Sequence, residues 1–394
     1  MITKARFHAF MGPALLLDKS AFQALSADEH TACHFMFMEN VTPVLLREIS
    51  GDLAKVDGNR PPQLLVQTLA DKFGGSGGTV NVDWEHLCLN SLGGQQVPMT
   101  GQIVVGPGPN RSVTHSSDGA SMMIGPSAEN YAIMRWAAAA FTDGEQQAAQ
   151  RFRDAAQAFE MTAFAGRLRG EPLPMARTVD EIPEKVDLLL NEPQQSMVVL
   201  QWLVDQLRPL ARAGALIPRL RRQVTGEWLR AGKPQWNACP YARHCARSLL
   251  ALLVGERVLS TRPTNRIDAE YLLYLPFCHV FVSNDKLHRQ LAPPLLGDYQ
   301  NFVPLELFKK DLARFWQVRR GADAEHRRRM DRCFGGRPWP APDSVLWALW
   351  EKYEPWKRSS GNRAIKLSDD ELRSALDEAE QLVAKANASL PALH

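Results

Sequence analysis

The chain lacks the features that mark membrane, secreted and disulfide-rich proteins. No apolar run approaches the length of about 20 residues that a membrane-spanning helix needs. The beginning of the chain also lacks a secretory signal, because Asp18 interrupts an apolar stretch that is already short. The six cysteines do not show the paired spacing of a disulfide framework, which favours a reducing compartment. We therefore expect a soluble cytoplasmic protein that does not use a membrane.

Two common nucleotide and metal signatures are missing as well. The glycine-rich GGSGG at residues 74–78 is followed by no Lys-Ser or Lys-Thr and preceded by no strand, so it is not a phosphate-binding loop. The stretch CPYARHC at residues 239–245 lacks the short paired spacing of a structural zinc site. A net charge of only +3 excludes a uniformly polybasic, nucleic-acid-coating protein. These observations exclude a phosphate-binding loop at residues 74–78, a structural zinc site at residues 239–245 and a uniformly polybasic protein.

The composition is that of a globular chain, and four regions differ in their pattern of predicted strands, helices and loops. Its 394 residues, 45% hydrophobic and 23% charged, suit one elaborated domain or two to three modules. Strand-and-helix patterns occur at both ends of a long interruption that is first rich in loops and then helical. Helical patterns return after it. We expect an α/β core with a central parallel sheet, divided as residues 1–56 (core, first part), 57–237 (insertion), 238–300 (core, second part) and 301–394 (helical C-terminal extension).

Two short apolar runs each end in an aspartate and continue into a helix. Ala14–Leu17 predicts a buried strand that ends at Asp18, and HVFVS at residues 279–283 predicts another just before Asp285. A third short strand is expected at residues 102–105. If the first two strands are parallel neighbours, both acids lie at the same edge of the sheet, where α/β proteins build their sites.

Two further acids are expected at that edge. Asp268 is placed at the start of a helix, and Glu48 on the helix that follows Pro43. Four converging carboxylates repel one another unless divalent cations neutralise them, and oxygen ligands alone suit Mg²⁺ or Mn²⁺. The simpler alternative is that the aspartates are helix caps, which is a common structural role.

Three segments together resemble the PIN-domain nucleases. ALLLDKSAFQAL resembles the first strand of the family with its acid, here Asp18. TPVLLREISGDL resembles the helix with the second acid, here Glu48. NRIDAEYLLYLPFCHVFVSNDKLH resembles the last two elements, with Asp268 and Asp285 in the acid positions. The chain departs from the family in the great length of the segment between Glu48 and Asp268.

The resemblance implies a PIN-like fold that hydrolyses RNA phosphodiester bonds with Mg²⁺ or Mn²⁺ held by the four acids. It also implies a bacterial toxin or antiviral defence effector, with a protein partner or inhibitor that binds the insertion or the extension. It leaves open whether the protein forms an oligomer.

The auxiliary residues are less specific. Asp52 is expected to be either an added ligand or, more simply, a solvated residue, and Asn265 either a polar helper or a turn residue. The others are the small polar residue Ser283 and two lysines beside site aspartates, Lys19 and Lys286.

Two alternatives remain open from the sequence. One is a catalytically inactive PIN-like protein that binds nucleic acid or serves as a scaffold. The other is metal-free RNA cleavage of the HEPN type, because Arg320 and His326 have a spacing found in that family. The first alternative differs from the nuclease in whether the acids meet at one ion, and the second in whether cleavage needs a metal.

Overall fold

The computed structural model describes residues 12–55, 60–74, 79–105, 111–116, 119–124, 127–166, 168, 173–207, 216–232, 234–259, 262–328, 338, 341 and 343–353; at 111–124 and 216–221 the backbone alone is described. The chain divides into two compact units. The first consists of Met1–Glu39, His279–Asn284 and Tyr299–His394, and the second of Asn40–Cys278 and Asp285–Asp298. Among the described helices, none is long and apolar enough to cross a membrane.

The protein has an α/β fold with a five-stranded sheet, all of whose pairings are parallel. The strand order is β3-β2-β1-β6-β7, and β1 pairs with β6 in the register Leu15 with Val280. This confirms the expected α/β class with a central parallel sheet. Both expected central strands are confirmed as continuous buried runs, the pattern of strands covered on both faces. Their bounds are Ala14–Leu17 (β1), Met38–Val41 (β2), Thr79–Val80 (β3), Val280–Ser283 (β6) and Asn301–Pro304 (β7).

The first unit surrounds its strands with four labelled helices. Ser26 and Glu29 form a reciprocal capping box that begins α2, and α15 packs against α2 and against α17. Phe308 of α15 is fully buried and its ring lies 5.6 Å from that of Phe37. The bounds are Lys19–Ala24 (α1), Ala27–Met36 (α2), Leu305–Gly321 (α15) and Val345–Tyr353 (α17). Residues 354–394, the end of the expected extension, lie outside the described residues.

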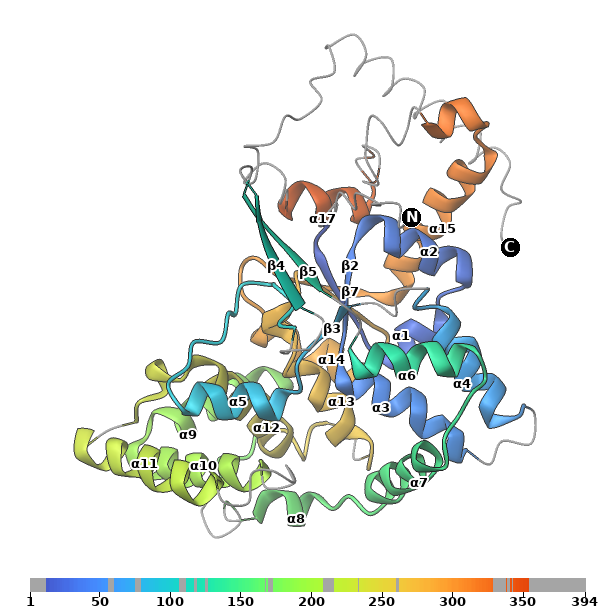
Figure 1. Ribbon diagram of the computed structural model, residues 1–394. Helices are drawn as coiled ribbons and strands as arrows, with labels where there is room; N and C mark the ends of the chain where they lie inside the picture. The colour runs from blue at the N-terminus through green and yellow to red at the C-terminus, as the bar shows by residue number, and fades with distance from the viewer. Residues whose placement is uncertain are drawn as a thin grey trace. The chain divides into compact units, whose positions relative to one another are not determined.

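The second unit is mainly helical and is organised around α12. This helix contacts α5, α9, α10 and α13, and Figure 1 shows α5, α9, α10 and α12 as one cluster. Most of α12 is buried because apolar or small residues cover nearly its whole circumference. A separate antiparallel hairpin joins Arg111–Ser116 (β4) to Gly119–Ile124 (β5). The helices are Pro43–Gly51 (α3), Pro62–Asp71 (α4), Trp84–Leu92 (α5), Ala128–Ala137 (α6), Asp143–Gln157 (α7), Met161–Ala165 (α8), Ile182–Asn191 (α9), Pro193–Gln206 (α10), Leu216–Ala231 (α11), Pro240–Val254 (α12), Asn265–Leu272 (α13) and Lys286–Leu291 (α14).

Two expectations about local structure are wrong. Residues 102–105 form no strand; the backbone N–H of Val82 donates to the carbonyl of Val104 at 2.8 Å, without a continuing ladder. The helix expected to begin at Asp268 begins three residues earlier, at Asn265, after the N-cap Thr264. Asp268 therefore lies inside the first turn and is not a cap.

Candidate metal site

Three of the four predicted acids are grouped in the second unit. Glu48 is on α3, Asp268 is on α13, and Asp285 is the N-cap of α14. Burial raises the pKa of Asp268 to about 7, and the charges of Asp285 and Glu48 raise it further, while His288 and Arg262 act in the opposite direction. The charges of these three carboxylates therefore influence one another, although their oxygen atoms do not all lie within 4.8 Å of one another. A cation shared by all three would relieve their repulsion and the cost of burial once they moved closer together.

Arg262 lies between two of these acids. Its Nη2 atom is 2.9 Å from Asp285 Oδ2, a hydrogen bond, and 3.9 Å from Asp268 Oδ2. The arginine is half exposed, whereas both carboxylates are mostly covered. One guanidinium nitrogen thus contacts both acids from the solvent side. A positive charge is already accommodated at this position, which is the charge that a metal ion would bring.

Tyr271 and His288 hold the acid-bearing helices together. The Tyr271 hydroxyl donates to Glu48 Oε2 at 2.5 Å, and His288 Nε2 lies 2.7 Å from the backbone carbonyl of Asp268. Because a carbonyl only accepts, His288 donates through Nε2. The two rings meet edge to face with centroids 5.7 Å apart. These supports were not found from the sequence, although each stands three residues after a predicted acid, on the same face of its helix.

Asp18 lies in the first unit and is almost fully buried. It directly follows β1 and caps α1, since its Oδ1 accepts the backbone N–H of Ala21 at 2.8 Å. Its Oδ2 accepts the hydroxyl of Ser283 at 2.6 Å, so the ends of the adjacent strands β1 and β6 are joined by a side-chain hydrogen bond. Ser20 donates to the same carboxylate at 2.9 Å. The cap interpretation is confirmed for Asp18 and, through Leu287 N–H at 2.7 Å, for Asp285; a ligand role stays a prediction.

The remaining auxiliary residues have different surroundings. Asp52 is 1% exposed and contacts Lys55 at 3.0 Å and Arg153 at 3.5 Å, so the expectation that it is solvated is wrong. Helix α3 ends at Gly51, so Asp52 lies in the short 3-10 helix Asp52–Ala54 that follows it. Asn265 is buried as the first residue of α13. Lys19 and Lys286 are the first residues of α1 and α14, and Lys286 is exposed.

A second charged group in the second unit begins one residue before Glu48. Arg47 contacts Glu270 at 2.5 Å and Asp83 at 3.5 Å. Glu270 also pairs with Arg266 at 2.9 Å. Burial, together with Asp83, raises the pKa of Glu85 to about 9, so this carboxyl is protonated at neutral pH. Two arginines and a retained proton balance this group, which makes it a structural network rather than a second metal site.

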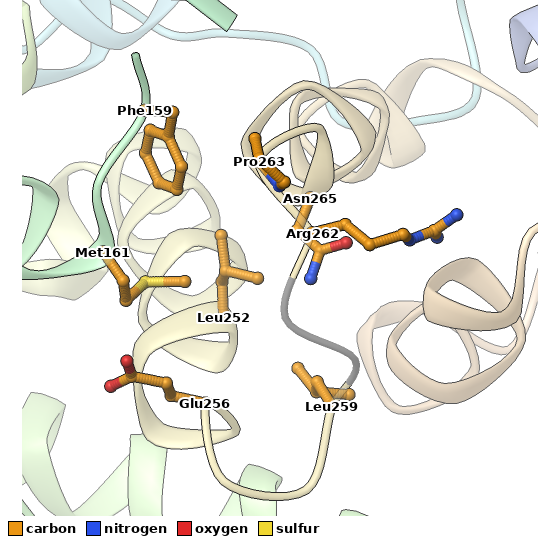
Figure 2. A pocket seen from close by; sticks show the side chains of 8 residues that line it. All are labelled: Phe159, Met161, Leu252, Glu256, Leu259, Arg262, Pro263 and Asn265. Carbon is orange, nitrogen blue, oxygen red and sulfur yellow. The ribbon is translucent and has the colours of Figure 1, made fainter. Parts of the chain in front are cut away.

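A pocket of about 240 Å³ adjoins the acid group in the second unit (Figure 2). Arg262 and Asn265 belong to its wall, and both are also close to the acids in sequence and structure. The opposite side presents Phe159 and Met161, whereas Pro263 lies on the side of Arg262 and Asn265 in the view. The pocket therefore combines an apolar surface with one cationic, one amide and one acidic side chain, the last from Glu256.

Arg320 and His326 of the metal-free alternative lie in the first unit. Arg320 pairs with Asp28 at 3.3 Å, and His326 Nδ1 contacts Asp323 at 2.9 Å. Helix α15 ends at Gly321, and the extended backbone of Ala322 follows, so the two residues are not on one continuous helix. Each side chain is held by a different acid, which does not favour a joint catalytic role.

The second unit thus offers a group of three acids, two of which contact Arg262, supported by a tyrosine and a histidine and bordered by a pocket. No protein-family model, curated protein or solved structure matches the chain, so the chemistry of this group is inferred from its own geometry.

Proposed function

We propose that the protein is a Mg²⁺- or Mn²⁺-dependent ribonuclease of PIN-like type. The observation that carries the proposal is the grouping of Glu48, Asp268 and Asp285. Burial raises the pKa of Asp268 to about 7, and the charges of Asp285 and Glu48 contribute in the same direction. Clusters of acids with perturbed pKa values gather at functional sites. Carboxylate oxygens are the donors that Mg²⁺ and Mn²⁺ prefer, so the residues fit these ions. The resemblance adds Asp18 as a further ligand, which stays a prediction.

The bound ion would supply Lewis-acid activation of the scissile phosphate and of an attacking water. The three carboxylates would hold the ion, and none needs to act as a general base. Tyr271 and His288 would keep Glu48 and the Asp268 backbone in place during the reaction. Arg262, half exposed and already beside the acids, would contact the phosphate.

RNA is proposed as the substrate on the resemblance, and the lining of the pocket is compatible with a base. Single-stranded RNA is recognised through bases that stack on apolar or aromatic side chains and are hydrogen-bonded along their edges. Phe159 offers a ring on one side of the pocket, and Asn265 offers an amide on the opposite side. A base of the substrate would enter this pocket while its phosphate lies at Arg262. A role as a bacterial toxin or defence effector is proposed on the resemblance alone.

The test is cleavage of labelled RNA by the wild type and by Asp268→Asn and Asp285→Asn, with Mn²⁺ and with EDTA. Each variant removes one charge and keeps the side-chain size, so cleavage should fall at least a hundredfold. Asp143→Asn, at an exposed first-turn position of α7, is the matched control and should cleave normally. A parallel single-stranded DNA substrate shows whether the activity is confined to RNA.

Cleavage that survives in both site variants, or persists in EDTA, would overturn the metal mechanism. In that case Arg320→Ala and His326→Ala test the metal-free alternative directly. The same assay addresses the inactive, nucleic-acid-binding alternative, which the contact of Arg262 with two acids favours because the charge there is already balanced. RNA binding without Mn²⁺-dependent cleavage by the wild type would support that alternative.

A further inference from the structure

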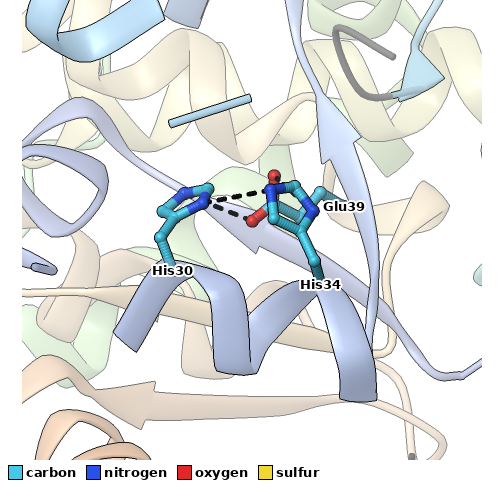
Figure 3. Close-up of side chains that lie close together, drawn as sticks. All are labelled: His30, His34 and Glu39. Atoms are coloured by element: carbon cyan, nitrogen blue, oxygen red, sulfur yellow. Dashed lines mark hydrogen bonds and ion pairs between the residues drawn. The ribbon is translucent and has the colours of Figure 1, made fainter. Parts of the chain in front are cut away.

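Two histidines on one face of α2 point toward a glutamate on the next strand (Figure 3). His30 and His34 are one helical turn apart, so their side chains project in the same direction. A single residue, Phe37, separates the end of α2 from the start of β2, and this sharp reversal brings Glu39 beside the histidines. All three residues belong to the first unit.

The three side chains approach one another closely. His30 Nε2 is 3.3 Å from Glu39 Oε1, His30 Nδ1 is 3.3 Å from His34 Nε2, and His34 Nδ1 is 4.0 Å from Glu39 Oε2. One donor atom from each residue can be chosen so that all three lie within 4.8 Å of one another. In a tetrahedral zinc site, ligand atoms about 2.0–2.1 Å from the ion are about 3.3 Å apart. Small side-chain rotations would close the remaining distance.

The donor set identifies the class of ion. Two imidazoles and one carboxylate are the three protein ligands of many zinc sites that keep a fourth position open. Imidazole nitrogens do not suit Mg²⁺, for which oxygen ligands are preferred. His30 and Glu39 are buried, whereas His34 is exposed, so an ion could enter past His34 and keep a water on that side.

We propose that His30, His34 and Glu39 form a binding site for Zn²⁺ or a closely related transition-metal ion, with one coordination position open to solvent. The site shares no residue with the proposed nuclease centre and takes a different class of metal ion. An ion bound there would fasten the end of α2 to β2, the strand that pairs with β1.

The electrostatics of the cluster agree with this assignment. Burial raises the pKa of Glu39 to about 7, and the nearby His34 lowers it only in part. A buried carboxylate with little compensating charge favours a divalent cation that would neutralise it. The neighbouring ring of Phe22, whose centroid is 4.6 Å from that of His30, limits the space on the buried side and keeps the imidazole oriented.

The experiment uses the full chain without a histidine tag, stripped of metal with EDTA and then dialysed. Zn²⁺ binding is measured by calorimetry, and Co²⁺ is added as a spectroscopic probe. We expect one tight Zn²⁺ site per chain and a visible Co²⁺ spectrum of four-coordinate nitrogen and oxygen ligation, without a thiolate charge-transfer band. His34→Gln and Glu39→Gln should each weaken Zn²⁺ binding at least tenfold, and Zn²⁺ should raise the thermal midpoint of the wild type but not of these two variants.

His326→Gln is the matched control, because His326 also contacts a carboxylate in the first unit but, within the part of the chain that the structure describes, belongs to no group of three possible metal ligands. It should bind Zn²⁺ as the wild type does. Circular dichroism of His34→Gln, at an exposed position, verifies that lost binding is not lost folding. Equal Zn²⁺ affinity in the wild type and His34→Gln would overturn the site. Asp268→Asn should keep full Zn²⁺ binding, so failure of the nuclease proposal and failure of this one give different results.

Discussion

The hydroxyl of Tyr271 donates to Glu48 at 2.5 Å, which joins α13 to α3 at the acid group. A hydrogen bond to an ionised carboxylate is stronger than a neutral one and fixes the orientation of the acceptor. The second oxygen of the carboxylate then faces a defined direction. Tyr271 is buried, and its ring rests against His288, so the donor itself has little freedom.

Replacing Tyr271 by Phe should therefore weaken metal binding by about 10–100-fold, the usual effect of removing a hydrogen-bond partner of a metal ligand. The free energy of unfolding should fall by about 1 kcal/mol or somewhat more, because the acceptor is charged. Mn²⁺ titration followed by electron paramagnetic resonance gives the first value, and urea denaturation gives the second. Tyr131→Phe, at an exposed site on α6, should change neither. An unchanged Mn²⁺ affinity in Tyr271→Phe would mean that Glu48 is not a ligand of the metal ion.

Arg262→Gln should have opposite effects on metal binding and on catalysis. The guanidinium repels an incoming cation from Asp285 and Asp268, so its removal should tighten Mn²⁺ binding several-fold. Cleavage at saturating Mn²⁺ should nonetheless decrease, because the contact to the RNA phosphate is lost. Arg257→Gln, an exposed arginine in the same unit, is the control. Weaker Mn²⁺ binding in Arg262→Gln would mean that the arginine supports the ion rather than competes with it.

Glu85→Gln should make the protein more stable at neutral and alkaline pH. Glu85 keeps its proton in the folded state up to a pKa of about 9, against 4.5 for the free side chain. The folded state therefore binds more protons than the unfolded state, and wild-type stability falls as pH rises from about 4.5 to about 9. The neutral amide removes this contribution, so the gain should be on the order of 1–3 kcal/mol at pH 8 and vanish near pH 4. Denaturation curves between these values provide the measurement; a gain independent of pH would show that Glu85 is not the titrating group.

Asn40→Ala should destabilise the second unit. Asn40 Nδ2 donates to the carbonyl of Phe277 at 3.0 Å, and its Oδ1 accepts from Asn81 Nδ2, also at 3.0 Å. All these groups are buried, so truncation leaves polar atoms without partners and should cost about 1–3 kcal/mol. Asn237→Ala, at an exposed position, should change stability by less than about 0.5 kcal/mol. Thermal unfolding of the two variants side by side decides between a structural and a dispensable role for Asn40.

The parts of the fold that the sequence predicted are those fixed by local pattern. Ala14–Leu17 is a strand because it is a short apolar run bounded by Pro13 and Asp18, and Ser26 begins α2 because Glu29 completes a capping box. The helix at Asp268 was misplaced because an acid is common in a first turn as well as at a cap. An aspartate alone therefore did not show whether Asp268 is the N-cap or lies inside the first turn of the helix.

The contacts around the acids could not be predicted from the sequence in the same way. Arg262 reaches Asp285 across 23 positions, and Tyr271 reaches Glu48 across 223. Neither pairing has a local signature, since it depends on how α3, α13 and α14 pack. The spacing of His30 and His34 was visible in the sequence, but Glu39 becomes their neighbour only through the reversal at Phe37.

Helices α3 and α13 are joined by two adjacent pairs, Arg47 with Glu270 and Glu48 with Tyr271. Both pairs have the same sequence separation, so they require the same alignment of the two helices. Shifting or rotating one helix by a single residue would break both contacts. The alignment of the helices is thus specified at their interface and not by the chain between them. Glu48 therefore keeps its place beside α13 through these two contacts, although it lies 223 positions before Tyr271 in the sequence.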